Sequence, residues 1–189
     1  HERGAKATRP HSSFEAIAMN PASLSIASEY VKAGMKRAGI PLSPTLEGYL
    51  SITFARFIKA AISVDQLTVR ATQAMDKNAP AETMRALADE CLIACAFFED
   101  RLRRNGTVRH YVGLGQVTYD AADLTEQAYG FVHMRDVIAC VAEPDRPRDA
   151  HTLVDQALAG SATAAADLEG QNIVVGPWGG ANKNGLLWH

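Results

Sequence analysis

The stretch 80–104, PAETMRALADECLIACAFFEDRLRR, carries the strongest structural signal in the sequence. Its apolar residues recur every three or four positions, which is the spacing of an amphipathic α-helix. Pro80 stands where a first helical turn tolerates proline, because the missing N–H has no partner there. Arg103 and Arg104 suit the negative end of the helix dipole, and Gly106 can adopt the conformation that ends a helix. We therefore predict one continuous helix over 80–104 at the centre of the fold.

Three segments upstream show the same helical period. Residues 22–38 form the first predicted helix, and residues 44–62, which are apolar on most sides, form a second central helix. Ser63 and Gln66 have the spacing of a capping box, so a shorter helix is expected to begin there and to end near Asn78. The N-terminal half of the chain is therefore predicted to be entirely helical.

The segment 108–122 has a helical pattern that contains Gly113 and Gly115. Glycine lowers helix propensity, so two glycines this close together favour a tight approach of another helix. The remaining predicted elements are a helix over 125–141, a linker over 143–147 and a last helix over 149–168. The C-terminal half is therefore also predicted to be helical.

These patterns define an all-α fold class. We predict a single helical-bundle-like domain of about six or seven helices, packed around residues 44–62 and 80–104. The predicted organisation is a flexible leader over 1–20, the all-α domain over 21–168, and an irregular C-terminal tail that contains glycine and tryptophan over 169–189.

Composition and charge exclude several classes of partner. The chain has 189 residues, with 19 basic and 21 acidic side chains and a formal net charge of −2. This balance gives no overall attraction to a nucleic acid, so a nucleic-acid partner is not expected. The apolar stretch 92–98 is far shorter than the roughly 20 residues that cross a bilayer, so membrane insertion is not expected either. Three cysteines fit a reducing compartment, and we predict a cytoplasmic protein.

The common linear signatures of catalysis and cofactor binding are missing from the sequence. It contains no phosphate-binding G-x-x-x-x-G-K-[ST] loop, no H-E-x-x-H zinc motif and no G-x-S-x-G nucleophile elbow. No Glu-x-x-His pair of the kind used by di-iron bundles is present. The sequence therefore assigns no catalytic residue, no metal ligand and no cofactor.

Five side chains are candidates for a ligand pocket, because they bring titratable or polar groups to predicted helices. Glu47 and Glu90 border apolar helix faces, where burial would raise the pKa of a carboxyl, although pairing with an arginine such as Arg56 or Arg109 is the alternative. His133 lies three positions before Asp136, which is helical spacing for a shared face. The full candidate set is Glu47, Glu90, His110, Tyr111 and His133.

Cys91 and Cys95 lie four positions apart on one face of the predicted helix over 80–104. That spacing would allow metal ligation or thiol chemistry. Both residues also fall on the apolar stripe of the helix, and free cysteine packs well as a small hydrophobic residue. We therefore interpret both as core residues.

The tail over 169–189 combines many glycines with Trp178 and Trp188. Ordering a glycine-rich segment costs conformational entropy, and tryptophan is a common anchor at interfaces. The leading functional hypothesis is a non-catalytic interaction protein, acting as an adaptor, accessory subunit or homo-oligomer, that docks through helical faces and these tryptophans. Two alternatives stay open: a helical bundle that binds a small ligand, haem or metal ion, and an enzyme without a linear signature.

Several short stretches also resemble uncharacterised helical proteins of proteobacteria. They are LSPTLEGYL over 42–50, DECL over 89–92, FFE over 97–99, Arg103-Arg104, and YVGLGQ over 111–116 with Tyr119. The resemblance covers about half of the chain. It implies an all-α bacterial protein and no particular activity.

Overall fold

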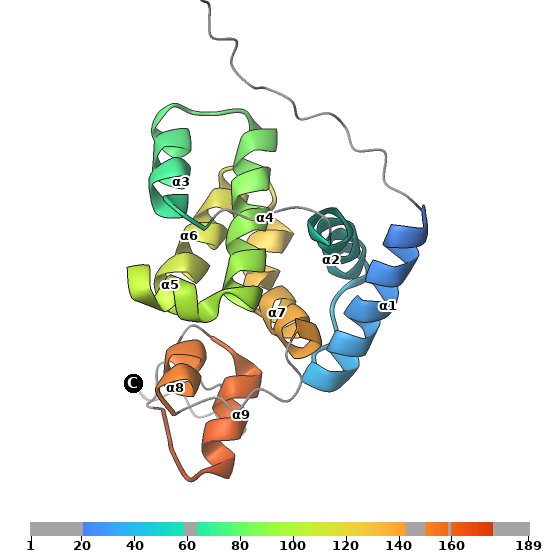
Figure 1. Cartoon of the computed structure of the whole chain (residues 1–189), viewed down its shortest axis with the longest axis vertical. Helices are drawn as coiled ribbons and strands as arrows, with labels where there is room; N and C mark the ends of the chain where they lie inside the picture. The colour runs from blue at the N-terminus through green and yellow to red at the C-terminus, as the bar shows by residue number, and fades with distance from the viewer. Residues whose placement is uncertain (1–20, 59–63, 143–149, 159, 176–189) are drawn as a thin grey trace, which may run out of the picture.

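The computed structural model describes residues 21–58, 64–142, 150–158 and 160–175. These residues form nine α-helices and no strand, which confirms the predicted all-α, bundle-like fold class (Figure 1). The helices are α1 (Pro21–Ala38), α2 (Pro44–Phe57), α3 (Leu67–Asp76), α4 (Ala81–Phe97), α5 (Glu99–Asn105), α6 (Val108–Asp120), α7 (Thr125–Ala142), α8 (Ala150–Leu158) and α9 (Ala162–Gly170). The predicted leader over 1–20 lies outside the described residues.

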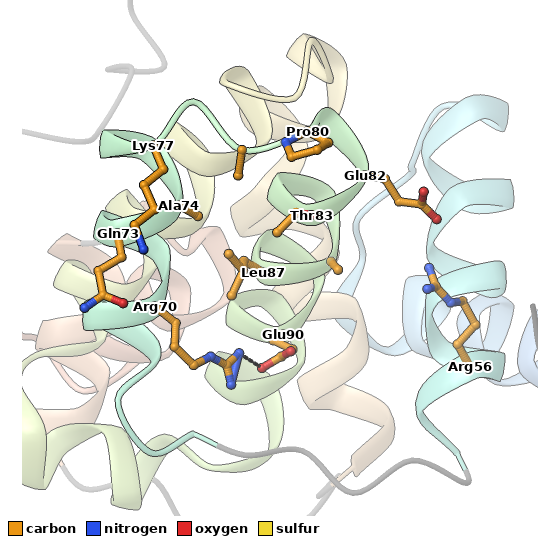
Figure 2. A pocket seen from close by; sticks show the side chains of 12 residues that line it. Arg56, Arg70, Gln73, Ala74, Lys77, Pro80, Glu82, Thr83, Leu87 and Glu90 are labelled. Carbon is orange, nitrogen blue, oxygen red and sulfur yellow. Dashed lines mark hydrogen bonds and ion pairs between the residues drawn. The ribbon is translucent and has the colours of Figure 1, made fainter. Parts of the chain in front are cut away.

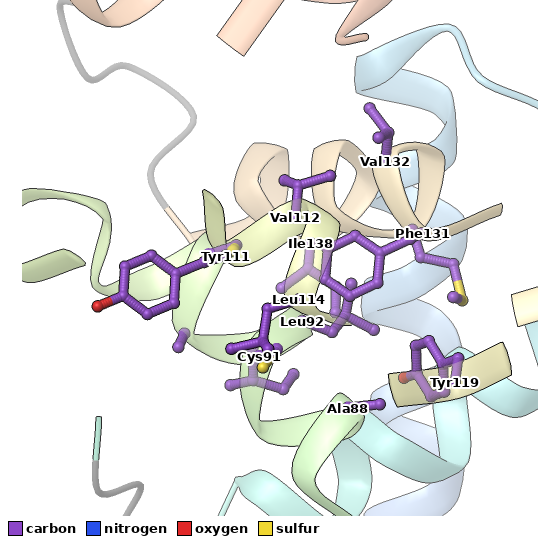
Figure 3. Packing of buried hydrophobic residues seen from close by; sticks show 14 of the residues in the cluster. Ala88, Cys91, Leu92, Tyr111, Val112, Leu114, Tyr119, Phe131, Val132 and Ile138 are labelled. Atoms are coloured by element: carbon purple, nitrogen blue, oxygen red, sulfur yellow. The ribbon is translucent and has the colours of Figure 1, made fainter. Parts of the chain in front are cut away.

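Helices α4, α6 and α7 pack against one another and form the centre of the bundle (Figures 1 and 3). The ring of Phe131 on α7 lies among buried side chains of α4 and α6, including Leu92 and Leu114. Helix α3 covers one side of α4, and α1 packs on α2 and α7 on the other side. Residues 44–62 are less central than predicted, because α2 packs mainly on α1 and exposes 43% of Ile52, although its Leu46 and Leu50 belong to the main core.

The predicted helix over 80–104 is broken at Phe98 into α4 and α5. Phe98 has φ −123° and ψ 34°, outside the helical region, yet its N–H still bonds to the carbonyl of Ala94. Leu102, four positions later, is fully buried, so the apolar period continues across the break. The sequence pattern therefore predicted one helix where the backbone bends at a single residue.

The predicted helix over 149–168 is also two helices. Gly160 has a φ of +96°, a conformation that glycine adopts without steric cost, and Ser161 then caps α9 by accepting a bond from the N–H of Ala164. The apolar pattern of the first half runs on into the alanine-rich stretch over 162–166, so periodicity did not reveal the turn between the two helices.

The capping box expected at Ser63 and Gln66 is not formed as predicted. Helix α3 begins at Leu67, and Gln66 lies in the left-handed region with a φ of 57° and makes no side-chain cap bond. Ser63 and the end of the predicted helix over 44–62 lie outside the described residues. The capping interaction on α2 itself is present, since Ser43 Oγ accepts from the N–H of Leu46.

None of the helices in the described part of the chain combines the length and the hydrophobicity that a membrane crossing requires. This finding agrees with the short apolar stretch seen in the sequence.

The two glycines of α6 have opposite surroundings. A Cβ added to Gly115 would lie 2.6 Å from Cζ of Phe131 and 3.1 Å from Cβ of Cys91, so the predicted close approach occurs at this position. A Cβ added to Gly113 would meet no atom within 4 Å. Glycine is therefore required by packing at one position and not at the other.

We predict that Gly115→Ala lowers the free energy of unfolding by about 1 to 3 kcal/mol, because the methyl group overpacks the contact between α6 and α7. The control Gly113→Ala removes a helix-interior glycine in open space and should raise the free energy of unfolding by about 0.5 to 1 kcal/mol. Urea unfolding followed by circular dichroism measures both. Equal effects of the two substitutions would contradict this packing.

Candidate functional site

A groove of about 660 Å³ lies along the outer face of α4, between α3 and the end of α2 (Figure 2). Its apolar floor is made of small side chains and one leucine: Ala74, Ala79, Ala86 and Leu87. Its charged side chains come from all three helices: Arg56 from α2, Arg70 at the middle of α3, Lys77 just after α3, and Glu82 and Glu90 from α4. The groove therefore combines an apolar floor with charges of both signs.

Local helix geometry explains why α3 presents its polar side chains to the groove. Leu67, Ala71 and Ala74 lie at helical spacing and are buried on the bundle side. Arg70 lies three positions after Leu67 and four before Ala74, so it borders this same face beside α4, and Lys77 follows the last turn of the helix. Asn78 has a φ of 47° and turns the chain toward α4.

Arg70 and Glu90 form an ion pair across the groove between α3 and α4 (Figure 2). Both side chains are half-buried. Burial raises the pKa of Glu90, the Arg70 guanidinium acts against this rise, and the neighbouring Asp89 adds to it. The pKa of Glu90 therefore depends both on its burial and on its pairing with Arg70.

Behind the groove, the carboxylate of Asp89 is buried with 1% exposure. Its Oδ1 accepts hydrogen bonds from the hydroxyls of Tyr49 at 2.7 Å and Tyr119 at 2.8 Å. Its Oδ2 lies 3.5 Å from Nη1 of Arg56. Burial raises the pKa of Asp89, while the two tyrosine bonds and the positive charges of Arg56 and Arg85 act in the opposite direction.

Both tyrosines of this cluster hold their protons more tightly than free tyrosine does. Burial is the largest cause of the raised pKa of Tyr49 and Tyr119, and the negative charge of Asp89 adds to it in each. Their rings meet edge to face with centroids 5.9 Å apart. The cluster is thus a packed polar core in which both hydroxyls donate to one carboxylate.

Arg56 connects the buried cluster with the groove. Its side chain is 34% exposed, lines the groove and reaches Asp89 at the same time. The 3.5 Å contact to Asp89 is long for a hydrogen bond, so most of the guanidinium donors are not used by it.

Only one of the five predicted pocket residues, Glu90, lines the groove. Its arginine partner is Arg70 rather than the predicted Arg56 or Arg109. The structure therefore brings Glu90 together with charges that the sequence pattern did not associate with it.

The other four predicted residues lie away from the groove and do not form one site. Glu47 is in the first turn of α2, and His133 is exposed on α7 while Asp136 of the same helix is buried. His110 is exposed and lies 3.1 Å from the hydroxyl of Thr68, with its ring against that of the buried Tyr111. Trp178 and Trp188 lie outside the described residues.

Sequence reasoning missed Asp89, Tyr49, Tyr119 and Arg70. The available signal was a carboxylate at position 89, beside Ala88 and within one turn of Leu92, on the apolar stripe of the predicted helix over 80–104. A charged residue in such a run needs a partner, but the sequence does not reveal which tyrosines supply it.

The interpretation of Cys91 and Cys95 as core residues is confirmed, since both are buried free thiols. Burial raises the pKa of Cys91, and it raises the pKa of Cys95 to about 12. Among the described residues, no three side chains of His, Cys, Asp or Glu come together in an arrangement that could hold a metal ion.

Comparison of the chain with protein-family models, with curated proteins and with solved structures found no match. The resemblance to helical proteins of proteobacteria therefore stays a prediction, and function is argued below from the geometry of the groove.

The raised tyrosine pKa values predict a loss of stability at high pH. Above the ordinary tyrosine pKa of 10.0 the unfolded chain releases a proton that folded Tyr119 retains, so the free energy of unfolding falls as pH rises. Between about pH 8 and pH 11 this loss should be about 1.4 kcal/mol smaller in Tyr119→Phe than in the unmodified chain.

Urea unfolding at a series of pH values measures this difference. Tyr129→Phe is the matched control, because Tyr129 is 83% exposed and its substitution should leave the pH dependence unchanged. The same pH dependence in all three proteins would contradict the buried-hydroxyl assignment.

Proposed function

We propose that this chain is a binding protein whose groove between α3 and α4 takes an amphipathic carboxylate. The observation that supports this most directly is the combination of a small-residue apolar floor with cationic side chains at its edge. Its volume of about 660 Å³ is in the range of small-molecule sites, and such sites pair an apolar lining with a few polar groups that fix orientation. This proposal follows the small-ligand alternative from the sequence, with a different set of residues.

The charges at the groove favour an anionic head group. Glu90 is already paired with Arg70, whereas the contact of Arg56 to buried Asp89 is long and leaves guanidinium donors for a ligand. Lys77 forms no ion pair among the described residues. A carboxylate placed near Arg56 or Lys77 would gain charge-assisted hydrogen bonds, while its apolar body would cover Ala86 and Leu87.

The lining favours binding over catalysis. It contains neither histidine nor cysteine. Its two carboxylates, Glu82 and Glu90, lie eight positions apart on α4, which corresponds to about 12 Å along the helix axis. At that separation they are too far apart to share a proton or to act on one small bond together.

We predict that decanoate binds to the groove and that neutral decanol binds at least about tenfold more weakly, because only the acid gains charge-assisted bonds. Binding is measured by titration with each compound and by chemical-shift changes of backbone amides. The changes should be concentrated in residues 70–90.

Lys77→Gln should weaken decanoate binding by roughly 5-fold to 10-fold without affecting the fold, since Lys77 is exposed. Arg104→Gln is the matched control, because Arg104 is exposed and distant in sequence from the groove. Equal affinity for decanoate and decanol, or shifts outside the groove, would overturn the proposal.

A protein-interaction role is the second candidate, and apolar exposure on α1 supports it. Ile26 and Tyr30 lie four positions apart on this helix and are each about half exposed. Ile173 and Val175 pack against α8 and α9, so the chain is fixed to this hairpin just before the segment that contains Trp178 and Trp188. Trp178 and Trp188 follow this attached segment in the sequence, so less conformational entropy of the chain is lost when they bind a partner.

We predict that the full chain self-associates and that a chain ending at Val175 does not, because the tryptophan anchors are lost while the packed residues up to Val175 are retained. The double substitution Trp178→Ala and Trp188→Ala should have the same effect as the truncation. Size-exclusion chromatography with light scattering measures the mass. A full chain that is monomeric at high concentration would remove this candidate and would leave the groove proposal unaffected.

A further inference from the structure

Helices α8 and α9 form a hairpin with an apolar core of its own. Leu153, Ala164 and Leu168 are buried together, and they form a cluster separate from the main core of the bundle. In Figure 1 the two helices lie beside each other below the bundle. Burial of this second cluster therefore stabilises the hairpin itself more than its attachment to the bundle.

Packing of α8 on α6, the turn at Gly160 beside Val132 of α7, and a set of polar contacts attach the hairpin to the bundle. Ser161 Oγ donates to Oδ2 of Asp136 on α7 at 2.6 Å, and Thr163 Oγ1 lies 3.3 Å from the same oxygen. Gln156 Nε2 donates to Oε2 of Glu99 on α5 at 2.7 Å. Asp136 is held in turn by Arg135, whose Nε donates to Oδ1 at 3.0 Å.

These contacts are buried but can be replaced by water. Asp136, Arg135 and Ser161 are each less than 5% exposed, and Nη1 of Arg135 is buried without a hydrogen-bond partner. Opening would hydrate a carboxylate and a guanidinium that are costly to bury, and this hydration offsets part of the cost of separating α8 from α6. The attachment is therefore weaker than the packing within the bundle.

We infer that the α8–α9 hairpin opens as a unit while the bundle stays folded, and that this opening uncovers the face of α7 that carries Arg135 and Asp136. Sub-global opening of this kind is expected where one part of a protein has an apolar core of its own, as the hairpin has. The inference is independent of the groove, which lies on α3 and α4.

Two buried thiols report on this opening separately from global unfolding. Both thiols are buried in the main core, but Cys95 lies only four positions before Glu99, whose carboxylate accepts a hydrogen bond from Gln156 of the hairpin. Cys91 lies one turn further from Glu99, and its Cβ is close to α6 at Gly115. Opening of the hairpin should therefore expose Cys95 and leave Cys91 protected.

The experiment is thiol labelling of the full folded chain by iodoacetamide, with the modified cysteine identified by peptide mass spectrometry. If the hairpin opens by itself, Cys95 is labelled at least about tenfold faster than Cys91 in the unmodified chain. Equal labelling rates at the two positions would overturn the inference, because they would indicate a single cooperative unit.

Substitutions of two matched helix-capping serines test whether the contact with Asp136 holds the hairpin closed. Ser161→Ala removes the donor to Asp136 and should raise the labelling rate of Cys95 by about 5-fold. Ser43→Ala removes an equivalent pair of contacts on the bundle, since Ser43 Oγ caps α2 and donates to Glu126 of α7 at 2.5 Å. Ser43→Ala destabilises the states with a closed and with an open hairpin equally relative to the unfolded chain. It should therefore increase the labelling rate of Cys91 only.

A rise in Cys95 labelling in Ser43→Ala, or no rise in Ser161→Ala, would contradict a separate opening of the hairpin. Hydrogen exchange gives the same test without thiols. Amides of 150–170 should exchange at a common rate that Ser161→Ala raises and Ser43→Ala leaves unchanged.

Discussion

The buried carboxylate of Asp89 is the constraint on which the arrangement of the bundle depends. A carboxylate with 1% exposure is tolerated only where hydrogen bonds and opposite charge replace the lost water. Tyr49 from α2, Tyr119 from α6 and Arg56 from α2 provide these contacts to a residue of α4. One side chain thereby fixes three helices relative to each other, and it also determines where Arg56 stands at the edge of the groove.

The second constraint is steric, because three helix pairs approach so closely at a glycine that an added Cβ would lie within 3 Å of an atom of the facing helix. A Cβ on Gly34 would overlap Val137 of α7, one on Gly115 would overlap Phe131, and one on Gly130 would overlap Leu46 of α2. All three contacts involve α7, which explains why this helix, rather than the segment 44–62, is central. The close approaches thus fix α7 against α1, α2 and α6, while the Asp89 cluster fixes α4 against α2 and α6.

Much of the fold was predictable from the sequence, but the candidate site was largely not. Periodicity and capping residues such as Ser43 located the helices, since these signals are local. The breaks at Phe98 and Gly160 were missed because the apolar pattern continues across both. The groove is lined by Arg56, Arg70 and Glu90 from three different helices, and no spacing within a single segment encodes such an arrangement. Glu90 alone was identified, because a carboxylate at the border of an apolar face is visible in one helix.

The groove and the hairpin differ in the forces that hold them, and this difference keeps their behaviour separate. The walls of the groove belong to the bundle, which is stabilised by apolar packing and by the Asp89 cluster. The hairpin is attached through Ser161, Gln156 and their carboxylate partners. A ligand shifts a conformational equilibrium only by its difference in affinity between the two states. Because the hairpin contributes no residue to the groove, a groove ligand meets the same contacts whether the hairpin is closed or open. Ligand binding and hairpin opening should therefore be energetically independent. Opening of the hairpin then exposes the face of α7 that carries Arg135 while a ligand stays bound in the groove.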